Sequence, residues 1–107
     1  MEKGLLVDGH AHLYELADLS VSLQEAKAAE VQGIIGVGAD IESSKKVLGI
    51  AKENREYVYA ALGYHPWEIE KEKVEENLSF IQERVEECVA LGEVGLDYRI
   101  KVKKELQ

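Results

Sequence analysis

The sequence predicts an α/β fold made of consecutive parallel βα units, and two observations carry this prediction. Short apolar runs of the kind found in buried strands alternate with longer stretches in which apolar residues recur at helical spacing. Each strand-plus-helix unit occupies roughly 27 residues, a length that suits parallel strands joined by right-handed crossovers. We therefore expect a parallel sheet with helices packed against it.

Four strands are expected along the chain. Each is an apolar run bounded by Gly, Pro or charged residues, as buried strands of parallel sheets usually are. The expected strands cover residues 4–12, 33–38, about 56–63, and 88–96.

Three helices are expected between these strands. The segment Ser22-Leu23-Gln24-Glu25 indicates a capping box, and Gly33 supplies the C′ residue at which the first helix ends. Asp40 caps the second helix, which runs to about Glu53. The third helix has an apolar stripe opposite a solvated face rich in glutamate. The stripe consists of Val74, Leu78, Ile81 and Val85.

Composition and charge exclude several classes of protein. A single cysteine, Cys88, forms no internal disulfide, so a disulfide-stapled secreted scaffold is excluded and the cytoplasm is the expected location. The apolar runs fall well short of the roughly 20 residues that span a bilayer, and we expect no membrane insertion. The net charge of −8 argues against a broad basic surface for duplex nucleic acid. Chemistry on nucleic acid would therefore need metal ions to supply positive charge.

Two histidines at the end of the first strand form a candidate metal site. Asp8, His10 and His12 occupy alternate positions, so their side chains project from one face of the strand. His10 and His12 lie at its carboxyl end, where two imidazoles can share one metal ion. The alternative is that both histidines are ordinary hydrogen-bonded residues of the core.

A carboxylate in the fourth strand is the second candidate. Glu93 interrupts an apolar strand, a place that is costly for a charge unless it is paired or bound to a cation. Asp97 follows four residues later on the same side of the strand. Parallel strands place their carboxyl ends at one rim, so we expect Glu93 within reach of His10 and His12. A structural ion pair is the alternative for both carboxylates.

The loop after the third strand is the third candidate. In Gly63-Tyr64-His65-Pro66-Trp67, Pro66 ends the strand and His65 stands at its mouth. Trp67 offers a flat apolar surface beside the expected site. We favour a lid that packs on the sheet as the role of Trp67, and stacking on a nucleobase is the alternative.

The end of the chain indicates that the sheet needs further strands. Residues 101–107 begin a helix-compatible pattern that stops without a C-cap or a closing strand. Four open parallel strands leave two unpaired edges, and such sheets are normally covered on both faces. We therefore expect either the front part of a larger barrel or a chain that takes its partner strands from another molecule, including a second copy.

Three segments together resemble the N-terminal signatures of the TatD family of metal-dependent deoxyribonucleases. They are Asp8-Gly9-His10-Ala11-His12-Leu13, Gly63-Tyr64-His65-Pro66-Trp67 and Gly92-Glu93-Val94-Gly95-Leu96-Asp97-Tyr98. The resemblance implies a (β/α)8 TIM barrel of about 250 residues, of which residues 1–107 would be the N-terminal half. It implies that His10 and His12 ligate one divalent ion and that Glu93 bridges two. It also implies that His65 and Asp97 line the site with Glu93 as catalytic residues, His65 near the phosphate.

The function implied by the resemblance is hydrolysis of phosphodiester bonds in DNA, in single strands or at ends, with two divalent ions that are Mg, Mn or Zn. The family's later ligands have no counterpart, because no histidine follows His65, so we expect the isolated chain to be inactive or weak. Two alternatives stay open. One is a cyclic-amide hydrolase or deaminase of the same superfamily, which usually has a modified lysine where this chain has Glu93. The other is a self-associating, metal-binding half-barrel without catalysis.

Overall fold

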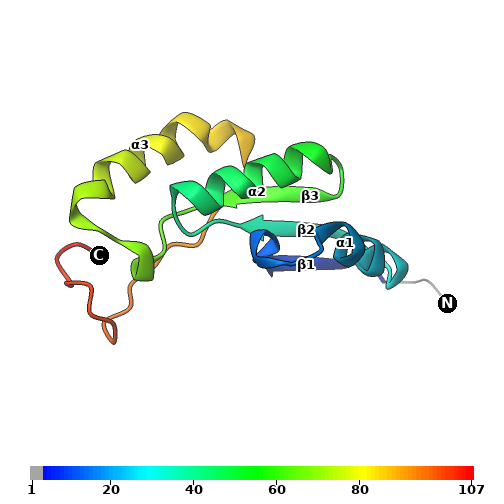
Figure 1. Ribbon diagram of the computed structural model, residues 1–107, viewed down its shortest axis with the longest axis horizontal. Helices are drawn as coiled ribbons and strands as arrows, with labels where there is room; N and C mark the ends of the chain where they lie inside the picture. The colour runs from blue at the N-terminus through cyan, green and yellow to red at the C-terminus, as the bar shows by residue number, and fades with distance from the viewer. Residues whose placement is uncertain (1–3) are drawn as a thin grey trace.

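The computed structural model describes residues 4–107 and shows a parallel sheet with helices packed along it (Figure 1). The strands are β1 (Leu6–Ala11), β2 (Val31–Val37), β3 (Val58–Leu62) and β4 (Ala90–Leu91), in the order β1-β2-β3-β4. The helices are α1 (Leu19–Ala28), α2 (Ile41–Glu53) and α3 (Val74–Arg84). Short 3-10 turns lie at Leu13–Glu15 (η1), Pro66–Glu68 (η2), Lys71–Lys73 (η3) and Val85–Glu87 (η4). Adjacent strands are all parallel, which confirms the expected first half of a (β/α)8 barrel.

The hydrophobic core lies between the sheet and the first two helices. Ile34 of β2 pairs in register with Val58 of β3, and both are buried beside Leu13 and Leu23. Because side chains alternate between the two faces of a strand, this packing leaves the other face of the sheet for a different set of residues. Ala11 of β1 packs against the core, and its neighbour His10 therefore lies on the other face, near His12, which directly follows the strand.

Helix α1 begins earlier in the chain than its sequence indicates. The cap is Asp18, whose Oδ1 accepts a hydrogen bond from the Val21 backbone N–H at 3.1 Å, so the expected start at Ser22 is wrong. The helix also ends before Gly33, which lies inside β2. An earlier start adds one helical turn to the face that meets the core. That face packs Leu19, Leu23 and Ala26 against the core.

Helix α2 has the cap and the bounds that the sequence predicts. Asp40 Oδ1 accepts a hydrogen bond from the Ser43 N–H at 2.9 Å, and the Asp40 N–H donates to Ser43 Oγ at 3.0 Å. This reciprocal pair is a capping box, and the helix ends at Glu53 as expected. Val47, in the middle of the helix, is fully buried. A strong local cap and a buried apolar centre therefore agree on this element.

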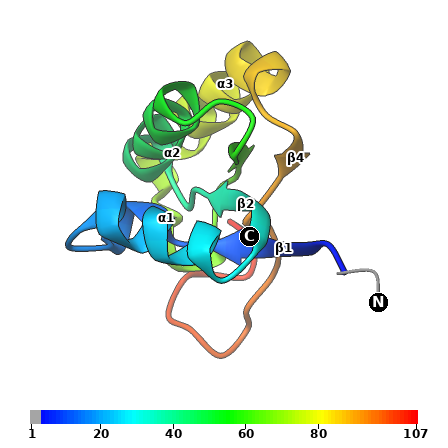
Figure 2. The same ribbon diagram turned by 90° about the vertical axis from the view of Figure 1, so that its right-hand side faces the viewer.

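Helix α3 does not bury the apolar stripe expected of it. Leu78 is 56% exposed and Val85 is 44% exposed, whereas Asn77 is buried and its Nδ2 donates to the Lys73 carbonyl at 2.9 Å. Both views place α3 alongside α2 and away from the sheet (Figures 1 and 2). Val74 and Ile81 are half-buried, so the stripe is only partly covered among the residues that the structure describes.

Both edges of the sheet are apolar and open. Strand β4 is shorter than expected, because regular pairing stops at Leu91. Exposed apolar side chains flank β1 and β4: Leu5, Leu6, Val7, Val89, Leu91, Val94 and Leu96. An exposed apolar edge of this kind is a surface for further strands. Within residues 4–107, none of the helices has the length and apolar character needed to cross a membrane.

Glu56, just before β3, has a backbone conformation that is unfavourable for a residue with a side chain. Its φ is 67°, in the left-handed region that favours glycine. We expect Glu56→Gly to increase the free energy of unfolding by about 0.5–1 kcal/mol, since glycine removes the steric cost of this conformation. Lys46→Gly, at an exposed position in the middle of α2, should lower it instead. Urea unfolding followed by circular dichroism measures both, and an unchanged or lower midpoint for Glu56→Gly would contradict the prediction.

Candidate metal centre

Strand β1 brings two imidazoles together at its carboxyl end. His10 is the last but one residue of β1, and His12 is the first residue after the strand. The two side chains lie on the same side of the chain. Their Nε2 atoms lie 3.3 Å apart. Asp8 does not join them, because its Oδ1 accepts a hydrogen bond from the His10 backbone N–H at 3.0 Å. The pair His10 and His12 is therefore the only part of this motif that faces the centre among the described residues.

Glu93 completes the cluster from the segment after β4. Its backbone is fixed from both sides: the Gly92 N–H donates to the Leu62 carbonyl at 2.8 Å, and the Glu93 N–H donates to the Gly38 carbonyl at 2.9 Å. Its carboxylate oxygens lie 3.3 Å from His10 Nε2 and 3.4 Å from His12 Nε2. The structure thus brings together His10, His12 and Glu93, as their positions at the strand ends predict.

Gly63 makes this approach possible. A Cβ atom built on Gly63 would overlap the backbone of Gly92 and Glu93. Only glycine lets the end of β3 run this close to the chain that follows β4. The position of Glu93 is therefore fixed by direct contact between two backbone segments, with no side chain between them.

The separations within the cluster fit ligands of one metal ion. Ligands about 2.1 Å from an ion in tetrahedral geometry lie about 3.4 Å from each other. The Nε2 atoms of His10 and His12 lie 3.3 Å apart, Glu93 Oε1 lies 3.3 Å from His10 Nε2, and Glu93 Oε2 lies 3.4 Å from His12 Nε2. When each residue offers one ligand atom, the three atoms all lie within 4.8 Å of one another. Two imidazole nitrogens and one carboxylate are donors that Zn, Mn and similar divalent ions accept. The chemistry and the spacing of these three side chains both suit a divalent cation.

Tyr14 orients His12, although the sequence had not singled it out. The Tyr14 hydroxyl lies 3.2 Å from His12 Nδ1. When Nε2 of His12 serves as a ligand, the ring carries its proton on Nδ1 and donates it to the Tyr14 oxygen. Burial and, second, the charge of Glu15 raise the pKa of Tyr14, so its hydroxyl stays neutral. Tyr14 lies in η1, beyond the end of β1, so the only signal in the sequence is that it lies two residues after His12.

His65 lies beside the cluster with a defined orientation. Its Nδ1 accepts a hydrogen bond from the Trp67 backbone N–H at 3.0 Å, so the ring proton lies on Nε2. That Nε2 is 3.9 Å from Glu93 Oε1. His65 therefore presents an N–H group, rather than a lone pair, to the region around Glu93.

Asp97 lies apart from the cluster, in contact with Trp67. The Trp67 Nε1–H donates to Asp97 Oδ2 at 2.8 Å, and the Arg99 N–H donates to Asp97 Oδ1 at 3.0 Å. The Trp67 hydrogen bond is the main cause that lowers the pKa of Asp97. Since regular β4 ends at Leu91, the side-chain alternation that predicted a common face for Glu93 and Asp97 does not extend to Asp97. Trp67 is 65% exposed, which contradicts the favoured interpretation of a lid packed on the sheet.

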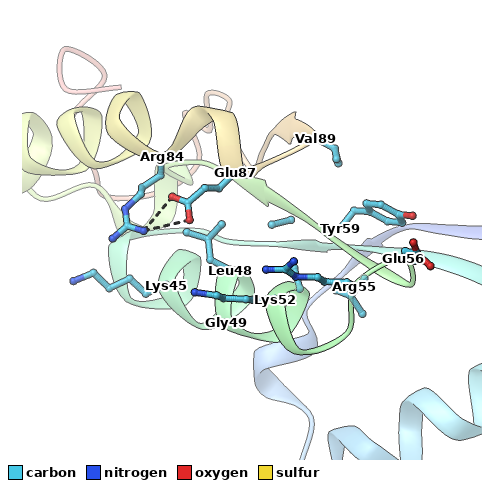
Figure 3. A pocket seen from close by; sticks show the side chains of 13 residues that line it. Lys45, Leu48, Gly49, Lys52, Arg55, Glu56, Tyr59, Arg84, Glu87 and Val89 are labelled. Carbon is cyan, nitrogen blue, oxygen red and sulfur yellow. Dashed lines mark hydrogen bonds and ion pairs between the residues drawn. The ribbon is translucent and has the colours of Figure 1, made fainter.

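A spacious groove lies elsewhere, along α2. It has a volume of about 660 Å³ and runs between α2, η4 and strand β3. Figure 3 shows its cationic side chains, which are Lys45, Lys52, Arg55 and Arg84. Arg84 is paired with Glu87 at 3.0 Å. None of the lining residues belongs to the cluster of His10, His12 and Glu93. We place the candidate site at the cluster because the metal-ligand chemistry is there.

Comparison with known proteins finds relatives for the part of the chain that carries His10, His12 and Glu93. The family model described as TatD related DNase matches residues 7–107. An uncharacterized metal-dependent hydrolase, YabD of Bacillus subtilis, is 37% identical over 96% of this chain and 42% of its own length. The deoxyribonuclease TATDN3 of Homo sapiens is 28% identical over 87% of this chain and 38% of its own length.

A solved structure resembles the fold. The crystal structure of YjjV, a TatD homolog from Escherichia coli, matches 87% of this chain and 38% of that chain, with a TM-score of 0.68 and 33% sequence identity. The chain thus spans about two fifths of the length of the relatives it matches. These comparisons cover both ends of the cluster, from β1 to the segment after β4.

Proposed function

Because the chain belongs to the family of TatD-related DNases, we propose that it carries the metal-binding part of a hydrolase that cleaves phosphodiester bonds in DNA. The observation that carries this proposal is the cluster of His10, His12 and Glu93, whose separations of 3.3 and 3.4 Å suit one divalent ion. DNA as substrate is supported by the human relative, which is named a deoxyribonuclease.

His10, His12 and Glu93 would hold one divalent ion, and Glu93 would also help to hold a second one. Such ions, Mg, Mn or Zn, would supply Lewis-acid chemistry toward a phosphoryl oxygen and would lower the pKa of a bound water. Tyr14 keeps the ring of His12 in the orientation that exposes Nε2. Since all three ligands stand on backbone that is fixed by hydrogen bonds, they need little rearrangement to bind.

We assign His65 and Asp97 different roles near the substrate. His65 Nε2–H faces the region of Glu93 and would donate a hydrogen bond to a phosphate oxygen. Asp97 would act through Trp67, whose indole it holds. The cytoplasm remains the proposed location, because Cys88 forms no internal disulfide.

Two alternatives remain candidates for test. A half-barrel without catalysis is favoured by the exposed apolar residues along both sheet edges, such as Val7 and Leu91, which a second copy could cover. A cyclic-amide hydrolase or deaminase would share the two histidines. The carboxylate of Glu93 at the fourth strand favours the nuclease over that class, because the amide hydrolases usually have a modified lysine there.

Calorimetric titration with Zn or Mn tests the metal site. We expect the parent chain to bind the ion and the double variant His10→Ala, His12→Ala to lose that binding, because two of three ligands are gone. Glu93→Gln should weaken binding, whereas Glu83→Gln on the solvated face of α3 should not, although both remove one negative charge. Equal binding by the parent and the double variant would contradict the proposal.

Hydrolysis of single-stranded DNA tests the reaction. We expect little or no cleavage by the 107-residue chain with Mg or Mn, because the family's later metal ligands, and the later carboxylate that would accept a proton from the attacking water, have no counterpart in it. Loss of a proton acceptor alone costs about 10² to 10⁴ in rate. A chain extended to the length of the relatives should cleave, and its Glu93→Ala variant should not. No cleavage by the extended chain would count against a nuclease.

Sedimentation at micromolar concentration tests self-association. With apolar side chains exposed beside both β1 and β4, we expect the 107-residue chain to form dimers or larger species. Val7→Lys, which places a charge beside the β1 edge, should shift the distribution toward monomer. A stable monomer of 12.0 kDa would contradict this expectation. If cleavage by the 107-residue chain rose with its concentration and vanished in Glu93→Ala, a catalytic dimer would replace the half-enzyme proposal.

A further inference from the structure

Trp67 is fixed in position and yet open to solvent. It is the single tryptophan of the chain, and it is 65% exposed. Its Nε1–H donates to Asp97 Oδ2 at 2.8 Å, and its ring meets the His65 ring at an interplanar angle of 81° with 5.3 Å between centroids. An aromatic ring that stays exposed does not stabilise the fold by being buried. Because this ring is nevertheless held in one orientation, we interpret it as a surface for a ligand.

The ring stands next to the candidate metal centre. It touches His65, and His65 Nε2 lies 3.9 Å from Glu93 Oε1. A hollow of about 480 Å³ opens beside Trp67, with Ile41 and Tyr64 also in its lining. None of the three metal ligands lines this hollow, and the link between the two places is Trp67, whose ring touches His65. A base held against the indole would therefore be separated from the metal ligands by the His65 ring.

We propose that Trp67 is the stacking surface for one nucleobase of a single-stranded DNA segment whose phosphodiester lies at the metal centre. This inference rests on the proposed function. Stacking suits an acidic chain, because an aromatic face attracts a base without needing a basic side chain, and it tolerates any base. Acidic side chains outnumber basic ones in the lining of the hollow: Asp40, Glu42, Glu68, Glu70 and Glu76 against Lys45 and Lys73. Lys73 is already paired with Glu70 at 3.0 Å, so phosphate groups are disfavoured there and the base is the part of a nucleotide that fits. Trp67 is thus a substrate-binding residue that accepts any base, and Asp97 is the residue that positions it.

Because Trp67 is the single tryptophan, its own fluorescence reports the contact directly. We expect a thymidine hexanucleotide, added to the 107-residue chain with Mg, to quench this fluorescence at saturating concentration. A hexamer of abasic deoxyribose phosphate has the same backbone charge and should quench much less. Equal quenching by both oligomers would overturn the proposal. Failure of iodide to quench Trp67 in the free chain would also overturn it, because another protein surface would then cover the indole.

Variants give a second readout by fluorescence anisotropy of a dye-labelled hexanucleotide. Trp67→Leu should raise the dissociation constant about 5- to 150-fold, the range of one lost base–aromatic contact. Trp67→Phe should keep most of the affinity, and Tyr59→Leu, which removes a different exposed aromatic ring on β3, should leave it unchanged. Unchanged affinity in Trp67→Leu would overturn the proposal.

The two proposals fail in different ways. If the base-containing oligomer quenches Trp67 but the extended chain cleaves no DNA, stacking stands and the nuclease does not. If the extended chain cleaves DNA but the two hexamers quench Trp67 equally, the nuclease stands and stacking does not. Circular dichroism of each variant shows whether a loss of affinity arises from unfolding, and the fluorescence titration of the parent chain needs no variant.

Discussion

The position of Glu93 depends on a close approach between two backbone segments. The end of β3 and the chain after β4 meet at Gly63, where a side chain would overlap Gly92 and Glu93. Hydrogen bonds to the carbonyls of Leu62 and Gly38 then fix the backbone on both sides of the carboxylate. The backbone that carries Glu93 is consequently held against β3 and against the residue that follows β2, and a preformed position spares the binding free energy that ordering would cost.

Local signals predicted the elements that local interactions decide. The cap at Asp40 was found because its partner Ser43 is three residues away. The start of α1 was missed because Asp18 and Ser22 are both good caps, and burial of Leu19 decided between them. The stripe of α3 had the right period, but period says nothing about what a helix packs against.

The same division holds at the site. His10, His12 and Glu93 were found because strand alternation and parallel topology fix their common rim. Asp97 is not one of the three clustered residues, because the alternation that relates it to Glu93 ends with the strand at Leu91, and its place in the site stays a prediction. The exposure of Trp67 follows from a hydrogen bond to a residue 30 positions away, which spacing along the chain does not encode. The positively charged side chains lie elsewhere, because Lys52 and Arg55 line the groove along α2. The cluster itself contains two histidines and a glutamate, so positive charge there would come from a bound metal ion.

The placement of α3 has a consequence for how the molecule opens. Its buried side chain, Asn77, bonds back to Lys73 in the same stretch of chain, while Leu78 remains in solvent. A helix held chiefly by its own ends and by neighbours along the chain can unfold without disturbing Ile34 and Val58 in the core. Amide hydrogens in α3 should then exchange through a local opening of low free energy, while those of β2 exchange only when the whole sheet comes apart. Helix α3 thus behaves as a separate cooperative unit beside α2. The metal ligands belong to the other unit, the sheet, which is the more stable of the two.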